Sequence, residues 1–283
     1  MWGPPPGGPP FPVTPRLFLG LALVISLAST AAAQFGFGGR RAAVRMPTEQ
    51  TFGQGFNFCR GIYTSTRGEA GGQGWSTDYP DAEWNFSIRL SELTKTRVKF
   101  AADGTPEFVT VRLTDPLLFQ CPYLHMEDVG TVSFSDTEVE ILRAYLLKGG
   151  FLWVDDFWGS YAWEAWVSEL SRVLPPSEYP IVDLPVDHPM FRTQIKMTEF
   201  PQIPSIQSWR RNPNETSERG YDSDEVHFRG IADQHGDVMV LMTHNTDISD
   251  AWEREGEDPT YFYSFSPKGY AVGINVILYA MTH

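Results

Sequence analysis

The most informative pattern in the chain is a short apolar run that ends in two carboxylates. Residues 151–154 are all apolar, they follow Gly149 and Gly150, and Asp155 and Asp156 come directly after them. An unbroken apolar run this short, next to a turn signal, predicts a strand that is buried on both faces, as in a parallel sheet. The segment before the glycines has apolar side chains at helical spacing, and the glycine turn ends it. Together these elements form half of an α/β unit.

The same patterns predict further elements along the chain. Strands are expected at residues 56–64, 108–113, 117–124, 180–184, 226–232 and 237–242, and helices at residues 81–96, 161–174 and 269–282. Residues 197–224 are rich in proline, serine and charge, which predicts an insertion on the surface. The alternation of strands and helices predicts an α/β domain.

The N-terminal region resembles a targeting segment. Residues 17–29 are apolar and three alanines follow at 31–33, a layout that predicts a secretory signal peptide over residues 1–33. The apolar run is shorter than the about 20 residues of a membrane span, and an uncleaved anchor is the alternative. Residues 34–54 are expected to be a flexible lead-in, and residues 55–283 a single domain. The expected location is the periplasm or the exterior of the cell.

Charge and cysteine content restrict the partners and the chemistry. The net charge of −13 argues against nucleic acid and anionic membrane surfaces. We expect another envelope protein or a small polar ligand as the partner, with membrane contact only through an uncleaved signal segment. A disulfide between Cys59 and Cys121 is geometrically possible if their strands are neighbours, and two buried free thiols are an equally strong alternative. Neither cysteine has the flanking motif of a nucleophile.

Polar residues follow several of the predicted strands. In open α/β sheets, ligands bind beyond the carboxyl ends of the strands, so these residues are expected to share one edge. The candidate ligand-binding residues are Ser76, Asp78, His125, Asp155, Asp156, His244 and Asn245. Carboxylates and imidazoles suit a divalent metal, acid–base work or a polar binding site without catalysis. We assign no catalytic residue, no cofactor and no metal ligand from the sequence.

Alternation along a strand makes a sharper prediction for the acidic pair. One carboxylate of Asp155 and Asp156, but not both, should be largely solvent-accessible in a concave site, while the other caps or braces the helix that follows. Two further polar stretches have simpler explanations. The glycine-rich loop at residues 67–81 lacks the spacing of known phosphate-binding loops and fits a surface loop, and Asp187 with His188 fits an ordered turn before a proline.

Four stretches, taken in order, resemble one bacterial family. They are the segment Gly149–Asp156 after a helix, the run Asp187–Phe191, the polar turn that ends in Trp252 and Glu253, and the segment Gly273–Val276. Over about residues 55–283 the chain resembles the family catalogued as domain of unknown function 4159. The resemblance implies a fold similar to class I glutamine amidotransferases, a three-layer flavodoxin-like sandwich with a mostly parallel sheet. It implies no established activity.

The resemblance also indicates what chemistry to exclude. Amidotransferases of that fold carry a cysteine in a Gly-x-Cys-x-Gly elbow after a core strand, whereas Val154–Phe157 stands at the corresponding place here. Because the thiolate is the reactive species, cysteine-dependent glutamine hydrolysis is not expected. The expected function is non-catalytic binding of a ligand or partner in the cell envelope. The alternatives are a metal-assisted or carboxylate/histidine hydrolase acting at the carboxyl ends of the strands, and a structural subunit of an envelope complex.

Overall fold

A seven-stranded sheet forms the centre of the fold. In the computed structural model, which describes residues 3, 43–53 and 55–283, the strand order is β3-β1-β4-β6-β9-β8-β7. These strands are β1 (Phe58–Ile62), β3 (Phe108–Arg112), β4 (Tyr123–Glu127), β6 (Phe151–Phe157), β7 (Val182–Asp183), β8 (His227–Ala232) and β9 (Val238–His244). The first five in the sheet are parallel, and β8 is antiparallel to both β9 and β7. The predicted mostly parallel sheet is confirmed.

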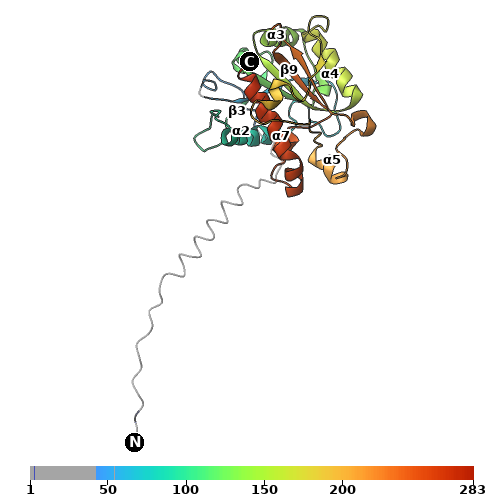
Figure 1. The fold of residues 1–283 in the computed structure, drawn as a ribbon. Coiled ribbons are helices and arrows are strands. Elements are labelled where there is room, and N and C mark those ends of the chain that lie inside the picture. The colour runs from blue at the N-terminus through green and yellow to red at the C-terminus, as the bar shows by residue number, and fades with distance from the viewer. Residues whose placement is uncertain (1–2, 4–42, 54) are drawn as a thin grey trace. The chain divides into compact units, whose positions relative to one another are not determined.

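Helices cover both faces of this sheet. Helices α2 (Asp81–Leu93) and α7 (Pro259–Ala280) lie on one face, and α3 (Asp136–Leu147) and α4 (Gly159–Val173) lie on the other (Figure 1). Because successive side chains of a strand point to opposite faces, Trp153 of β6 joins the core under α2 and α7, whereas Val154 joins the core under α3 and α4. The fold is therefore a three-layer α/β sandwich.

The order of the parallel strands locates the binding crevice. In chain order these strands are β1, β3, β4, β6 and β9, so their order in space is 2-1-3-4-5, which is the order of flavodoxin-like folds. The connections change direction between β1 and β4. Ligands of such folds bind at this switch point, outside the carboxyl ends of the strands.

One strand prediction is wrong in part. Residues Pro116–Gln120, predicted as the start of a strand at 117–124, form a 3-10 helix, and β4 begins only at Tyr123. The reason lies in the preceding residues: the carboxylate of Asp115 accepts a hydrogen bond from the Leu117 N–H at 2.9 Å, and Pro116 occupies the first helical position, where its missing N–H costs nothing.

The last helix is longer than its pattern predicts. Helix α7 begins at Pro259, not near residue 269, because Asp258 caps it by accepting hydrogen bonds from the N–H groups of Thr260 and Tyr261.

The smaller helices are α5 (Ile206–Arg211), α6 (Asp250–Glu253) and the 3-10 turns Val129–Thr131, Pro189–Arg192 and Gly220–Ser223. The short strands β2 (Thr64–Ser65) and β5 (Val132–Ser133) form a separate antiparallel pair. His188 caps the turn at Pro189–Arg192, as predicted.

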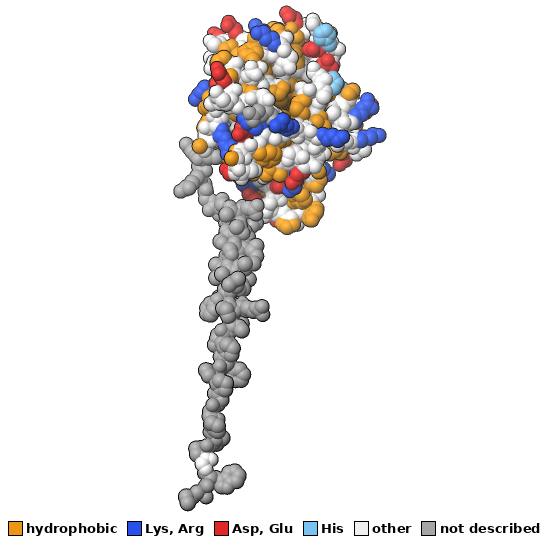
Figure 2. Space-filling view, turned by 90° about the vertical axis from the view of Figure 1, so that its left-hand side faces the viewer, with side chains coloured by type: hydrophobic (Ala, Val, Ile, Leu, Met, Phe, Trp, Pro, Cys, Tyr) orange, Lys and Arg blue, Asp and Glu red, His pale blue; other side chains and the backbone are white. Residues whose placement is uncertain are grey.

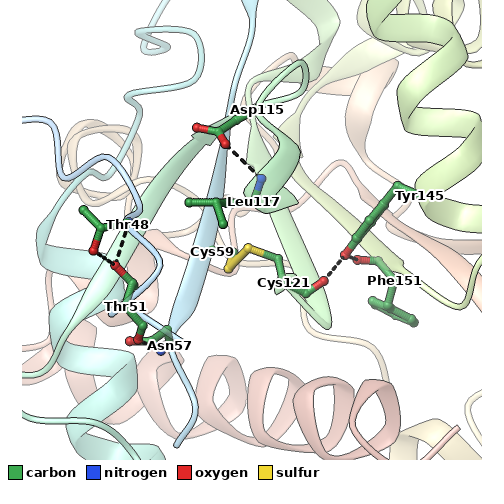
Figure 3. The surroundings of a disulfide bond; sticks show 9 residues. All are labelled: Thr48, Thr51, Asn57, Cys59, Asp115, Leu117, Cys121, Tyr145 and Phe151. Carbon is green, nitrogen blue, oxygen red and sulfur yellow. Dashed lines mark hydrogen bonds between the residues drawn. A yellow bond between two sulfur atoms is a disulfide. The ribbon is translucent and has the colours of Figure 1, made fainter. Parts of the chain in front are cut away.

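The two cysteines form a disulfide. Cys59 lies in β1 and Cys121 lies just before the neighbouring strand β4, with their Cα atoms 6.1 Å apart (Figure 3). Both residues are buried in the core under α3 and α4. Tyr145 fixes this corner, because its hydroxyl donates hydrogen bonds to the carbonyl oxygens of Cys121 at 2.9 Å and Phe151 at 3.2 Å. Of the two alternatives for the cysteines, the disulfide is therefore the one the structure contains.

Part of the predicted lead-in contacts the domain. The Thr110 N–H donates to the Arg45 carbonyl oxygen at 2.8 Å, and the Tyr79 hydroxyl donates to that of Ala43 at 2.9 Å. The predicted signal peptide, residues 1–33, lies outside the described residues apart from Gly3. Within the part of the chain that the structure describes, no helix has the length and apolarity to cross a membrane.

Candidate functional site

A polar cavity of about 280 Å³ lies at the carboxyl ends of the central strands. Its walls are the glycine-rich loop after β1 and β2, the residues that end β4 and β6, the turn after β9, and part of segment 197–224. This is the crevice at the switch point between β1 and β4, where flavodoxin-like folds bind ligands.

Acidic residues predominate in the lining of this cavity. Its acidic residues are Glu69, Asp78, Asp128, Asp156, Glu218, Asp247 and Asp250, and its basic residues are Arg211, Arg219 and Arg254. Among the described residues that line it, there is no histidine and no cysteine. The outer surface differs, since acidic, basic and hydrophobic side chains are interspersed over the face in Figure 2. The excess of carboxylates at this edge favours a ligand that carries positive charge.

The acidic pair at the end of β6 divides in part as predicted, because one carboxylate lines the cavity, but the other braces the turn after β9 and not the helix that follows β6. Asp155 is fully buried and accepts hydrogen bonds from the Thr243 hydroxyl at 2.5 Å and from the N–H groups of Ile248 at 2.8 Å and Ser249 at 3.1 Å. It thereby ties β6 to β9 and to the turn that follows. Asp156 is partly exposed and lines the cavity. Asp155 is therefore a structural residue and Asp156 a candidate ligand contact.

Backbone strain concentrates at the same edge. Asp128 after β4, Asp156 in β6 and Asn245 after β9 have φ angles of 50°, 51° and 63°, and Asp78 in the glycine-rich loop has a φ of 60°. Asp and Asn tolerate this left-handed region best among residues with a side chain, yet each still costs free energy. Such conformations cluster at functional sites, and the three aspartates all line the cavity.

The glycine-rich loop approaches Asp128 closely. The Gly74 N–H donates a hydrogen bond to Asp128 Oδ2 at 2.8 Å. A Cβ atom at Gly72 would lie 2.3 Å from the same oxygen, so a side chain there would push the loop away. Because Gly72 and Gly74 have no side chain, the loop packs closely against Asp128. This packing places Asp78 and Glu69 at the cavity, so the loop is more than a surface turn.

The other predicted site residues lie away from the cavity. His125 is fully buried, with its Nε2 2.5 Å from Glu127 Oε1 and 3.1 Å from Ser249 Oγ, and burial lowers its pKa. His244 Nε2 lies 3.1 Å from the Gly159 carbonyl oxygen, and burial lowers its pKa to about 4. The structure therefore brings neither predicted imidazole to the cavity wall.

Ser76 and Asn245 order loops. The Ser76 hydroxyl donates to the Gln73 carbonyl oxygen at 3.1 Å. Asn245 accepts from the Gly159 N–H at 2.8 Å and donates to the Glu225 carbonyl oxygen at 2.7 Å. Of the seven residues predicted from the sequence, Asp78 and Asp156 are therefore the ones that line the cavity.

Several cavity residues were missing from the sequence prediction. Asp128 directly follows β4, and placing that strand at 117–124 concealed its polar end. Asp247 and Asp250 belong to the polar stretch at the end of β9, from which the sequence prediction included only His244 and Asn245. Residues 197–224, predicted as a surface insertion, also form part of the wall and contribute Ser205, Gln207, Arg211, Glu218 and Arg219.

Burial makes the carboxylates of the cavity reluctant to ionise. Burial raises the pKa of Asp78, Asp156 and Asp247 well above its ordinary value, and the charges of neighbouring carboxylates act in the same direction. Burial also raises the pKa of Asp128 to about 8, assisted by a hydrogen bond with Glu69. A bound cation would stabilise the ionised carboxylates. The carboxyl groups of the cavity are therefore suited to release their protons when a positively charged ligand binds.

Asp128 leads to a prediction on pH. The folded protein keeps a proton on Asp128 up to about pH 8, whereas an unfolded chain releases it above about pH 4. Since the folded state binds the extra proton, this residue lowers the free energy of unfolding as the pH rises between these values. We expect Asp128→Asn to make the decline of the melting temperature from pH 5 to pH 8.5 shallower.

Asparagine suits this test because it tolerates the positive φ of Asp128. Glu164, an exposed residue of α4, provides the control Glu164→Gln, which should leave the pH dependence of the melting temperature unchanged. Parallel pH profiles for the Asp128→Asn variant and the native protein would show that Asp128 does not hold a proton.

The comparisons with known proteins identify a family without a known activity. A family model described as Domain of unknown function (DUF4159) matches residues 63–281. Among curated proteins, none matches the chain. The family match spans every strand of the central sheet except β1, which ends at Ile62 just before the match begins, and it agrees with the resemblance carried by the four stretches. The chain therefore belongs to the DUF4159 family.

Proposed function

We propose that this chain is an exported amidotransferase-like domain that lacks a catalytic cysteine and binds a small polar ligand through a positively charged group. The observation that carries the proposal is the acidic cavity at the carboxyl ends of the parallel strands. An ammonium or guanidinium group offers several N–H donors, and carboxylates accept the strongest hydrogen bonds from such donors. The ligand class is therefore an organic cation with further polar groups.

The absence of a suitable nucleophile supports binding without cysteine chemistry. Val154–Phe157 stands where the resemblance places the elbow cysteine, and both carboxylate oxygens of Asp155 in this segment accept structural hydrogen bonds. Cys59 and Cys121 are joined to each other in the core under α3 and α4. A disulfide is typical of proteins in oxidising compartments, which supports export to the periplasm or the exterior.

The hydrolase alternative has less support. In its carboxylate/histidine form it needs a carboxylate and a histidine that act on the same bound molecule. His125 is enclosed with Glu127 and Ser249, and His244 contacts the start of α4. Because neither imidazole lines the cavity, a ligand held by Asp156 would not reach them without rearrangement.

Calorimetric titration of the purified full chain tests the proposal. We expect putrescine, agmatine or lysine to bind, and the anionic or neutral analogues succinate and butanol to show no heat of binding. Losing one charge-assisted hydrogen bond costs about 1.5–3 kcal/mol, so Asp156→Asn should weaken binding of the cationic probe by about tenfold or more. Asparagine also suits the positive φ of Asp156, so the melting temperature should change little.

Glu164→Gln is the matched control, because it removes a carboxylate from the exposed face of α4 and should leave the affinity unchanged. The proposal is contradicted if none of the cationic probes binds. It is also contradicted if the Asp156→Asn variant, like the Glu164→Gln control, binds them as tightly as the native chain does.

A further inference from the structure

Three carboxylates converge at one end of the acidic cavity. Asp78 comes from the glycine-rich loop, whereas Asp250 and Glu253 lie one helical turn apart in α6. Each offers one oxygen atom, and these three oxygens all lie within 4.8 Å of one another. Asp78 and Asp250 line the cavity directly. The cluster thus combines two segments that are far apart in the sequence.

An unsatisfied oxygen sets this cluster apart from an ordinary group of acids. Asp78 is 8% exposed, and its Oδ2 atom is buried without a hydrogen-bond partner. A buried carboxylate oxygen left unpaired costs free energy, so its presence at a cavity wall indicates a ligand that would satisfy it. The loop that presents Asp78 is itself held in place, because the Arg60 guanidinium donates to the Thr77 carbonyl oxygen at 2.9 Å.

The other two carboxylates are already oriented. Asp250 Oδ2 accepts hydrogen bonds from the Ile206 N–H and the Tyr261 hydroxyl, both at 2.8 Å. Arg254 Nε lies 2.7 Å from Glu253 Oε2 and 3.7 Å from Asp250 Oδ1. Asp250 is thus fixed by hydrogen bonds, whereas Glu253 is held by the ion pair alone, because its Oε2 and the Nε of Arg254 have no hydrogen-bond partner among the described residues. Part of the site is therefore ordered before any ligand arrives, which lowers the cost of assembling it.

The charges of the cluster select the kind of ligand. One guanidinium beside three carboxylates leaves an excess of two negative charges when all are ionised, and a divalent cation would neutralise it. The ligand atoms are all carboxylate oxygens, the type that Ca²⁺ and Mg²⁺ prefer. No imidazole or thiolate belongs to the cluster, so the set is a poor match for Zn²⁺ or Cu²⁺.

We propose that Asp78, Asp250 and Glu253 bind a hard divalent cation of the Ca²⁺ or Mg²⁺ class at the inner end of the acidic cavity. This inference deepens the proposed function and rests on the same cavity, with the metal ion at the inner end and the organic cation beside Asp128 and Asp156. The bound ion completes the coordination of the free oxygen of Asp78 and joins the glycine-rich loop to α6.

Titration of Ca²⁺ and Mg²⁺ into the chelator-treated full chain at pH 7.5 tests this site. We expect one ion to bind per chain and to raise the melting temperature. Asp78→Asn and Glu253→Gln should each weaken binding by tenfold or more and abolish that rise, while Glu164→Gln should bind as the native chain does. Using two variants at separate segments keeps the test valid if one of them folds poorly.

The metal site would be overturned if neither Ca²⁺ nor Mg²⁺ binds, or if both variants bind the ion with the same affinity as the native chain. The outcome is separable from that of the proposed function. Binding of putrescine or agmatine without binding of Ca²⁺ or Mg²⁺ refutes the metal site alone. Binding of a divalent ion that both variants lose, without binding of any organic cation, supports the metal site and refutes the ligand class proposed for the cavity.

Discussion

Removing the Cys59–Cys121 disulfide will lower the free energy of unfolding by about 4 kcal/mol. The two cysteines are 62 residues apart in the sequence, and a cross-link over a loop of this length restricts the unfolded chain by roughly that amount in the chain-entropy estimate. For a domain of this size the loss corresponds to a melting temperature lower by roughly 10 °C. Denaturant unfolding of the Cys59→Ala/Cys121→Ala variant against the oxidised native chain measures the difference.

The same variant supplies the control for this prediction. Reductant added to the denaturant series should shift the midpoint of the native chain toward that of the double variant, and it should leave the double variant unchanged. Coincident unfolding curves for the oxidised and reduced native chain would mean that the disulfide contributes nothing to stability.

Replacing Arg60 with methionine will destabilise the fold by about 3–5 kcal/mol, the usual cost of leaving buried charges without their partner. Arg60, Glu83 and Glu127 are all fully buried; Arg60 Nε forms an ion pair with Glu83, and its Nη2 lies 3.5 Å from Glu127 Oε1. This network connects β1 to α2 and β4 directly below the cavity. Urea unfolding at pH 7 measures the loss.

Two comparisons make this prediction specific. Arg89 forms ion pairs at the surface with Glu92 and Glu255, so Arg89→Met should cost below about 1 kcal/mol. Adding Glu83→Gln and Glu127→Gln to Arg60→Met should restore part of the loss, because no charge is then left unpaired. If Arg60→Met costs no more than Arg89→Met, the buried network is not a stabilising feature.

The sequence predicted much of the fold because its local signals agree with the tertiary structure. The apolar run before Asp155 forms the central strand β6, and the helix before it is α3, capped by Ser135 through a capping box. These elements are long, periodic and bounded by clear start and stop residues. Leu117 illustrates the opposite case, because the cap at Asp115 and Pro116 overrides the strand preference of the apolar residues that follow.

The candidate site was less predictable for a physical reason. Alternation along β6 predicted that only one of Asp155 and Asp156 would face a cavity, and the structure identifies Asp156 as that one. His125 lies in the middle of β4 and His244 ends β9, and their rings point into the packed interior and toward α4, which depends on side-chain direction rather than spacing. The wall supplied by residues 197–224 depends on how a long connection folds back, which no local pattern specifies.

The proposed function depends on whether a ligand binds in the acidic cavity. The most direct test is a crystal structure of the full chain grown with the tightest organic cation from the titrations. We predict density for its ammonium or guanidinium group between Asp128 and Asp156. Density instead in the cavity of about 430 Å³ at the opposite end of the sheet, which is lined by Gly149, His235 and Tyr279, would contradict the proposed function.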